Sequence, residues 1–119
     1  MRKRLLPLAL CLGLSMTACW QNDVGRSYYS SGKVRTEATV RNGLLDGPST
    51  MYFENGTKMS EANYRAGILH GKTTSFYQSG VMSAEANYAD GILSGISIRW
   101  DESGHETARA NFQNGRVIQ

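Results

Sequence analysis

One feature constrains this chain more than any other: a period of 24 residues that holds without insertion or deletion over most of its length. Residues 52–56 read YFENG, and residues 76–80, which start 24 positions later, read FYQSG. Residues 67–71 and 91–95 have the same offset and read GILHG and GILSG. An exact period of this length is typical of repeat architectures, in which each unit packs against its neighbours. The sequence therefore predicts a linear stack of equivalent units.

Glycines and aromatic residues recur in this frame at fixed positions, which we call columns. The glycine columns are Gly32, Gly56, Gly80 and Gly104; Gly43, Gly67, Gly91 and Gly115; and Gly47, Gly71 and Gly95. One aromatic column is Tyr28, Tyr52, Phe76 and Trp100, and a column of small residues is Ala38, Ala62, Ala86 and Ala110. The frame predicts a repeat domain over residues 28–119, with units 28–51, 52–75, 76–99 and a shortened 100–119. We expect the small residues to pack closely under aromatic rings.

Each unit has the pattern of two strands joined by tight turns. Asn-Gly, Asp-Gly and Ser-Gly pairs lie between alternating runs, and glycine adopts the positive φ that such turns require. Alternation predicts two faces: Lys58, Ser60, Ala62 and Tyr64 on one, and Met59, Glu61 and Asn63 on the other, with Met82 joining the first face in the next unit. We predict an all-β protein, an elongated and twisted antiparallel sheet of stacked β-hairpin repeats with no helix in its mature part.

The N-terminus has the pattern of an export signal. Arg2, Lys3 and Arg4 precede an apolar run over residues 5–16 that is too short to span a bilayer. The following residues 15–19, SMTAC, resemble the lipobox of bacterial lipoprotein precursors. This resemblance implies that a signal peptide of residues 1–18 is removed, that Cys19 carries lipid such as palmitate, and that residues 19–27 form a tether. An ordinary secretory signal with an incidental cysteine is the alternative.

Charge and cysteine content agree with export. The net charge of +3 and the pI of about 9.0 include three basic residues of the signal. Without residues 1–18, ten basic and ten acidic residues remain, so we expect no nucleic-acid partner. Cys19 is then the single cysteine, which excludes an internal disulfide and suits lipid attachment. For a Gram-negative cell, the resemblance to lipoproteins implies an outer membrane location facing the periplasm or the cell surface, because Trp20 stands in place of aspartate.

The repeat resembles MORN-type repeats, in the bacterial variant found in YwqK-type antitoxin proteins. The resemblance rests on the aromatic residue and glycine of residues 52–56, on the segment EANY at 61–64, and on GILHG at 67–71. It implies a twisted antiparallel sheet and the binding of a toxic protein, and in an exported chain the role becomes envelope immunity. The last unit departs from the pattern at Asp101, Arg109 and Arg116, and we interpret it as a polar cap.

Three patterns that resemble catalytic or ligand sites are explained by the repeat. Residues 67–73, GILHGKT, resemble a phosphate-binding loop, but Ala66 stands where its first glycine is needed. The column Glu37, Glu61 and Glu85 is expected to be a solvated face, because its members lie about 10 Å apart, two strands away from each other. His70 and His105 lie in different columns without a second ligand. We therefore expect no catalytic residue, metal or cofactor.

These observations favour a lipid-anchored envelope protein that binds another protein through a concave face or an open edge. The candidate partner-binding residues are Glu37, Glu61, Glu85, Tyr52, Phe76 and Trp100, with the turn column Asp46, His70 and Ser94 as a further place for specificity. The alternative is a structural scaffold or spacer without a single ligand. An enzyme is the third reading, and no group of residues supports it.

Overall fold

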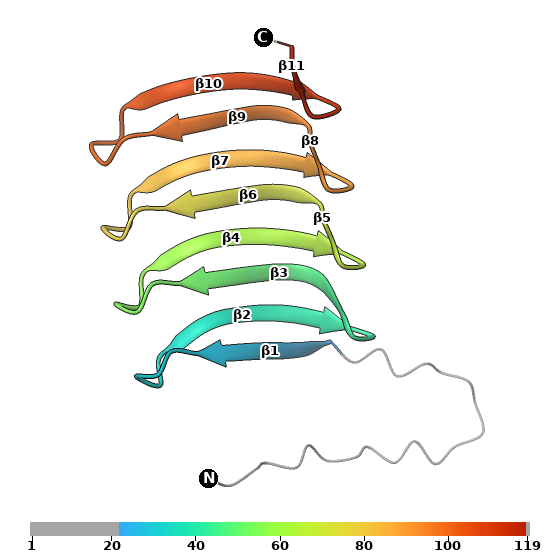
Figure 1. Ribbon diagram of the computed structural model, residues 1–119, viewed down its shortest axis with the longest axis vertical. Coiled ribbons are helices and arrows are strands. Elements are labelled where there is room, and N and C mark those ends of the chain that lie inside the picture. Colours follow the sequence, from blue (N-terminus) through green and yellow to red (C-terminus); the bar gives the residue numbers. More distant parts are fainter. Residues whose placement is uncertain (1–21, 119) are drawn as a thin grey trace, which may run out of the picture.

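Hairpins stack into one antiparallel sheet in the computed structural model of the chain, which describes residues 22–118 (Figure 1). The strands are β1 (Asp23–Tyr28), β2 (Val34–Arg41), β3 (Leu44–Tyr52), β4 (Lys58–Arg65), β5 (Ile68–Leu69), β6 (Gly71–Phe76), β7 (Met82–Ala89), β8 (Ile92–Leu93), β9 (Gly95–Trp100), β10 (Glu106–Gln113) and β11 (Arg116–Val117). They follow the order β1-β2-β3-β4-β6-β7-β9-β10-β11, with β5 on β4 and β8 on β7. The predicted all-β hairpin stack is confirmed. No helix in the described range is long and apolar enough to cross a bilayer.

The turns form where the sequence predicts them. Positive φ occurs at Asn42, Ala66, Asp90 and Asn114, with values of 49–51°, and at the glycine that follows each of them. Two consecutive residues with positive φ make the type I′ turn whose twist matches a two-residue hairpin. Of these four non-glycine residues, only Ala66 lacks a polar side chain, so it is the residue least suited to a positive φ.

The register defines two faces of the sheet. On the glutamate face, consecutive strands bring together Glu37, Thr50, Glu61, Thr74, Glu85, Ile98 and Arg109. On the alanine face, the neighbouring positions carry Ala38, Ser49, Ala62, Thr73, Ala86, Ser97 and Ala110. Each column in the sequence is therefore a line of side chains that runs across the strands.

A bulge in each hairpin corrects part of the predicted alternation. The register shifts between Met51 and Tyr52, so Lys58 pairs with Tyr52 and its ammonium group bonds to Glu61 on the glutamate face. The same shift pairs Met82 with Phe76. The predictions that placed Lys58 and Met82 on the alanine face are wrong, because one extra residue reverses the alternation beyond it.

The sheet begins earlier than the expected domain start at residue 28. Residues 23–27, which we expected in the tether, pair along β2 as part of β1, from Asp23 opposite Val40 to Ser27 opposite Thr36. β1 lies one period before residues 47–52 of β3, so it occupies the same place in its hairpin. The frame of 24 residues thus extends to Asp23.

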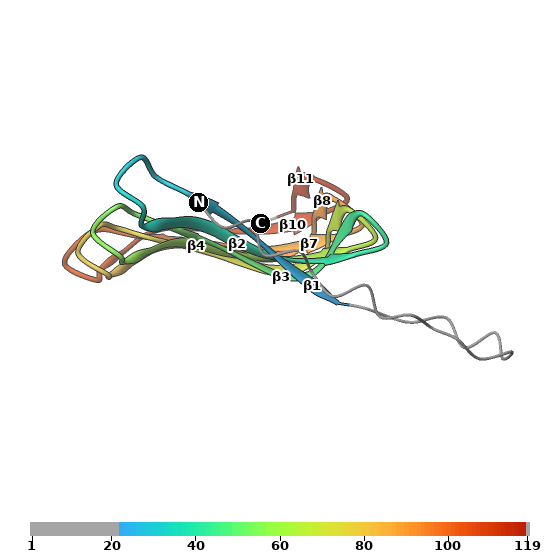
Figure 2. The same ribbon diagram turned by 90° about the horizontal axis from the view of Figure 1, so that it is seen from below.

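The sheet is a single thin layer with little core (Figure 2). Among the described residues, only Ala38 and Thr74 are buried, each at 8% exposure. Glycines at 47, 71 and 95 have φ of 115°, 95° and 88°, and the chain bends there. Figure 2 shows β8 and β11 standing up from the layer on one side. The sequence predicts rings packed over small residues, but Tyr28 is exposed and Tyr52, Phe76 and Trp100 are only half-buried, because residues 22–118 form no second layer over them.

Candidate binding surfaces

The alanine face is hollowed over β6, β7, β9 and β10, neighbouring strands in Figure 1. The hollow has a volume of about 450 Å³. Its floor consists of small side chains and its wall of larger apolar ones: the floor includes Thr73, Ala86, Ser97 and Ala110, and the wall Tyr88, Leu93 and Phe112. Leu93 pairs with Tyr88, so the raised β8 forms part of the wall. The size suits a ligand or an extended segment of polypeptide.

Among the polar residues that line this hollow, Glu85 is paired with Lys72 and Arg109 with Glu106, whereas polar side-chain groups of three others lack partners among the described residues. The guanidinium of Arg99 lies at its lining, is exposed, and makes no ion pair within residues 22–118. The hydroxyl oxygens Thr73 Oγ1 and Ser97 Oγ are buried and make no hydrogen bond within residues 22–118. The hollow is thus an apolar surface with one unpaired positive charge, which favours a partner that carries a carboxylate or another anion.

The glutamate face has its three carboxylates paired with cations. Arg26 Nε lies 2.6 Å from Glu37 Oε2, and Lys72 Nζ lies 3.3 Å from Glu85 Oε1. Glu61 bonds to Lys58. The hydrogen bond to Glu37 raises the pKa of Arg26, and the hydrogen bond to Glu61 raises the pKa of Lys58.

The spacing of the carboxylates gives no acid–base pair. Thr74 pairs with both Glu61 and Glu85 and so separates them by one strand. Because each carboxylate is paired with its own cation and kept apart from the next, the column has the character of a solvated ladder. A recognition role for Glu37, Glu61 and Glu85 remains a prediction.

The aromatic candidates Tyr52, Phe76 and Trp100 are half-buried and serve two kinds of contact. Tyr52 and Glu37 line a second hollow of about 490 Å³ beside the turn glycines Gly32 and Gly56. The carbonyl of Trp100 accepts a hydrogen bond from the Tyr77 hydroxyl at 2.9 Å. The backbone of Trp100 therefore links successive units, and the part of Tyr52, Phe76 and Trp100 in binding a partner stays a prediction.

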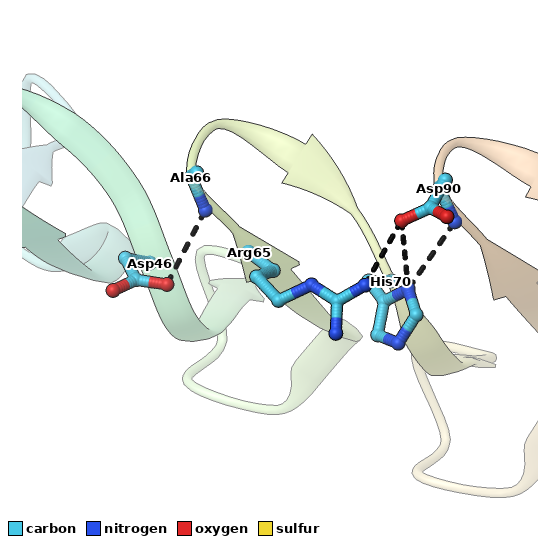
Figure 3. A network of polar contacts seen from close by, with 5 residues as sticks. All are labelled: Asp46, Arg65, Ala66, His70 and Asp90. Atoms are coloured by element: carbon cyan, nitrogen blue, oxygen red, sulfur yellow. Dashed lines mark hydrogen bonds and ion pairs between the residues drawn. The ribbon is translucent and has the colours of Figure 1, made fainter.

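Two members of the turn column, Asp46 and His70, tie one unit to the next (Figure 3). Asp46 Oδ1 accepts a hydrogen bond from the backbone N–H of Ala66 at 3.3 Å. His70 Nδ1 accepts one from the N–H of Asp90 at 3.2 Å, and Arg65 also bonds Asp90, at 3.0 Å. The sequence predicts this column as a place for partner specificity, and the structure gives two of its members, Asp46 and His70, an internal role.

The last unit contains a group that sequence reasoning did not anticipate. Arg109, which stands in the glutamate column, forms a two-pronged bond with Glu106, with both contacts at 2.8 Å. Asp101 accepts hydrogen bonds from the N–H groups of Ser103 and His105 and closes its own turn. The Glu-x-x-Arg spacing of Glu106 and Arg109 is visible in the sequence, but the bulge that brings the two side chains together is not.

Lipid attachment at Cys19 stays a prediction. Cys19, the expected lipid attachment site, lies outside the described residues. Within residues 22–118 no group of three or more His, Cys, Asp or Glu side chains is placed to hold a metal ion.

Comparison with known proteins identifies a repeat family. Residues 24–42, 45–66 and 69–90 each match the family described as MORN repeat variant, and together they cover just over half of the chain. No curated protein and no solved structure shows significant similarity to it.

Proposed function

Because the chain belongs to the MORN repeat variant family, we propose that it is a lipid-anchored envelope protein that binds a protein partner through its alanine face. MORN repeats form binding or scaffold modules and are typically non-catalytic. The observation that carries the proposal is the apolar hollow over β6 to β10, whose lining includes the guanidinium of Arg99, which has no ion-pair partner within residues 22–118. An apolar surface with a few polar groups is what an interface needs at its centre.

The anchor places this surface at a membrane. The order of basic residues, apolar run and SMTAC supports acylation of Cys19, and two or three acyl chains hold a protein stably on a bilayer. Replacing Cys19 by alanine should release the protein from the membrane fraction and change its mature mass. A Cys19→Ala protein with unchanged fractionation and mass would contradict the anchor without affecting the binding face.

Binding is tested by photo-crosslinking in intact cells from one residue on each face. A crosslinking amino acid at Ala84 reports on the hollow, and one at Asn63, which is exposed on the glutamate face, is the matched control. One stoichiometric adduct from position 84 supports a specific partner there. Diffuse adducts from both positions support a scaffold or spacer, which is the alternative function.

The partner class that we propose is a toxic protein, in line with the resemblance to YwqK-type antitoxins. In an exported protein this role becomes envelope immunity. Co-expression with the product of a neighbouring gene should then suppress its toxicity. If Glu61→Lys with Glu85→Lys abolishes suppression and Arg99→Glu does not, the glutamate face is the site instead of the alanine face.

A further inference from the structure

The repeat spacing of the alanine face matches one regular polypeptide conformation. Equivalent residues in successive units lie two strands apart, which is about 9.6 Å at about 4.8 Å per strand. Tyr88 on β7 and Phe112 on β10 stand in this relation along the wall of the hollow. A polyproline II helix repeats every three residues, over about 9.3 Å. An α-helix repeats every 5.4 Å or so and an extended strand about every 6.8 Å, so neither matches.

The chemistry of the hollow suits the same ligand. Small side chains such as Ala86 and Ala110 let a backbone approach closely, and the rings of Tyr88 and Phe112 offer flat apolar surfaces. Grooves lined by aromatic residues accept polyproline II segments, whose stiffness lowers the entropy lost on binding. Such a ligand needs no backbone ladder, so it can lie across the strands without pairing with a sheet edge.

The positive charge of Arg99 favours an acidic ligand over a basic one. Arg99 lies at the hollow, and the one carboxylate among the described lining residues, that of Glu85, is paired with Lys72. A guanidinium without a partner attracts a carboxylate and disfavours a lysine. We propose that the alanine face binds an acidic, proline-rich segment in the polyproline II conformation, laid across β6 to β10. This inference rests on the proposed function and specifies its ligand.

Three synthetic peptides test the proposal against the isotope-labelled full chain in an NMR titration. Four repeats of Pro-Pro-Asp present a carboxylate on every turn of a polyproline II helix. Four repeats of Pro-Pro-Lys keep the conformation and reverse the charge, and four repeats of Gly-Ser-Asp keep the charge in a flexible chain. We expect saturable shifts at Ala86, Tyr88 and Ala110 with Pro-Pro-Asp, and binding at least about fivefold weaker with each of the others.

Reversing the charge of Arg99 should reverse which peptide the protein prefers, a result that is not expected if Arg99 only stabilises the fold. Arg99→Glu should make the protein prefer Pro-Pro-Lys over Pro-Pro-Asp. Lys33→Glu is the matched control, because Lys33 is exposed, lines the second hollow and does not line the hollow over β6 to β10, and it should leave the preference unchanged.

Several outcomes would overturn the inference. They are equal binding of the flexible peptide, shifts confined to the glutamate face, an unchanged preference in Arg99→Glu, and the absence of saturable binding by all three peptides. If none of the peptides binds while crosslinking from position 84 still captures one partner, the proposed function stands and this inference alone fails.

Discussion

His70 accepts, through Nδ1, a hydrogen bond from the backbone N–H of Asp90 across 20 residues of sequence, at 3.2 Å. An accepting Nδ1 belongs to a neutral imidazole that carries its proton on Nε2. The bond joins the second unit to the second turn of the third, as Asp46 joins the first unit to Ala66 (Figure 3). In a sheet without a second layer, contacts between successive turns stabilise the stack because few side chains are buried.

Removing this acceptor should destabilise the stack. We expect His70→Ala to lower the free energy of unfolding by about 1 kcal/mol, the net value of one hydrogen bond. His70→Asn, which restores a neutral acceptor oxygen, should recover most of the loss in urea denaturation. Ser94→Ala at the same column is the control, since no side-chain hydrogen bond of Ser94 occurs within the described residues. An equal loss in His70→Ala and Ser94→Ala would argue against the bond.

Tyr29, Phe53 and Tyr77 occupy the same position in successive units, each one residue after a member of the aromatic column, and they allow two substitutions with opposite expected effects. The hydroxyls of Tyr29 and Tyr77 donate to the carbonyls of Tyr52 and Trp100, at 2.7 and 2.9 Å, while Phe53 in the unit between has no hydroxyl. Tyr77→Phe should cost about 1 kcal/mol of unfolding free energy, and Phe53→Tyr should gain a similar amount by reaching the carbonyl of Phe76. Thermal and urea unfolding of both variants measure this. A destabilised Phe53→Tyr would show that the site has no room for the hydroxyl.

Ala66 is the residue least suited to its backbone. Its φ of 49° lies in the left-handed region, which costs a residue with a Cβ about 1–2 kcal/mol and which asparagine tolerates best after glycine. Ala66→Asn should therefore raise the free energy of unfolding by about 1 kcal/mol. Asn42→Ala, at the equivalent turn of the first unit, should lower it by a similar amount. The two changes in urea midpoint should be opposite in sign, and the same sign for both would refute this account.

The sequence predicted the hairpins because period, glycine and turn chemistry are local signals. It missed features that depend on the three-dimensional register. The bulge that moves Lys58 to the glutamate face depends on pairing with Tyr52, and no residue type marks it. The partners Asp46 and His70 could have been found, because each is a polar acceptor one residue before a positive-φ glycine. The hollow could not, because it arises from strand curvature and from the raised β8.

The contribution of the Arg109–Glu106 pair to the stability of the last unit should depend on pH. The hydrogen bond from Arg109 lowers the pKa of the Glu106 carboxyl. A lowered folded-state pKa means that the contribution to stability is present above the unfolded-state pKa and is lost as the pH falls through the folded-state value. NMR titration of the Glu106 carboxyl should show the lowered pKa, and Arg109→Gln should return it towards the ordinary value. High salt should weaken the effect because both groups are exposed. The same pKa with and without Arg109 would exclude the pair as the cause.

Alanine substitutions at Gly91 and Gly104 distinguish the cost of backbone strain from the cost of a steric clash between units. Both have positive φ, 81° and 84°, so an added Cβ is strained at either position by about 1–2 kcal/mol. At Gly104 the Cβ would meet nothing within 4 Å, whereas at Gly91 it would lie 3.3 Å from Cγ2 of Ile68 in the preceding unit. Gly91→Ala should therefore destabilise the protein more than Gly104→Ala. Adding Ile68→Ala should remove the excess by freeing that space, so the two costs measured by urea denaturation should then agree. A persistent excess would mean that Ile68 is not what limits the turn, and that the hydrogen bond from Gly91 N to Leu69 O is disturbed instead.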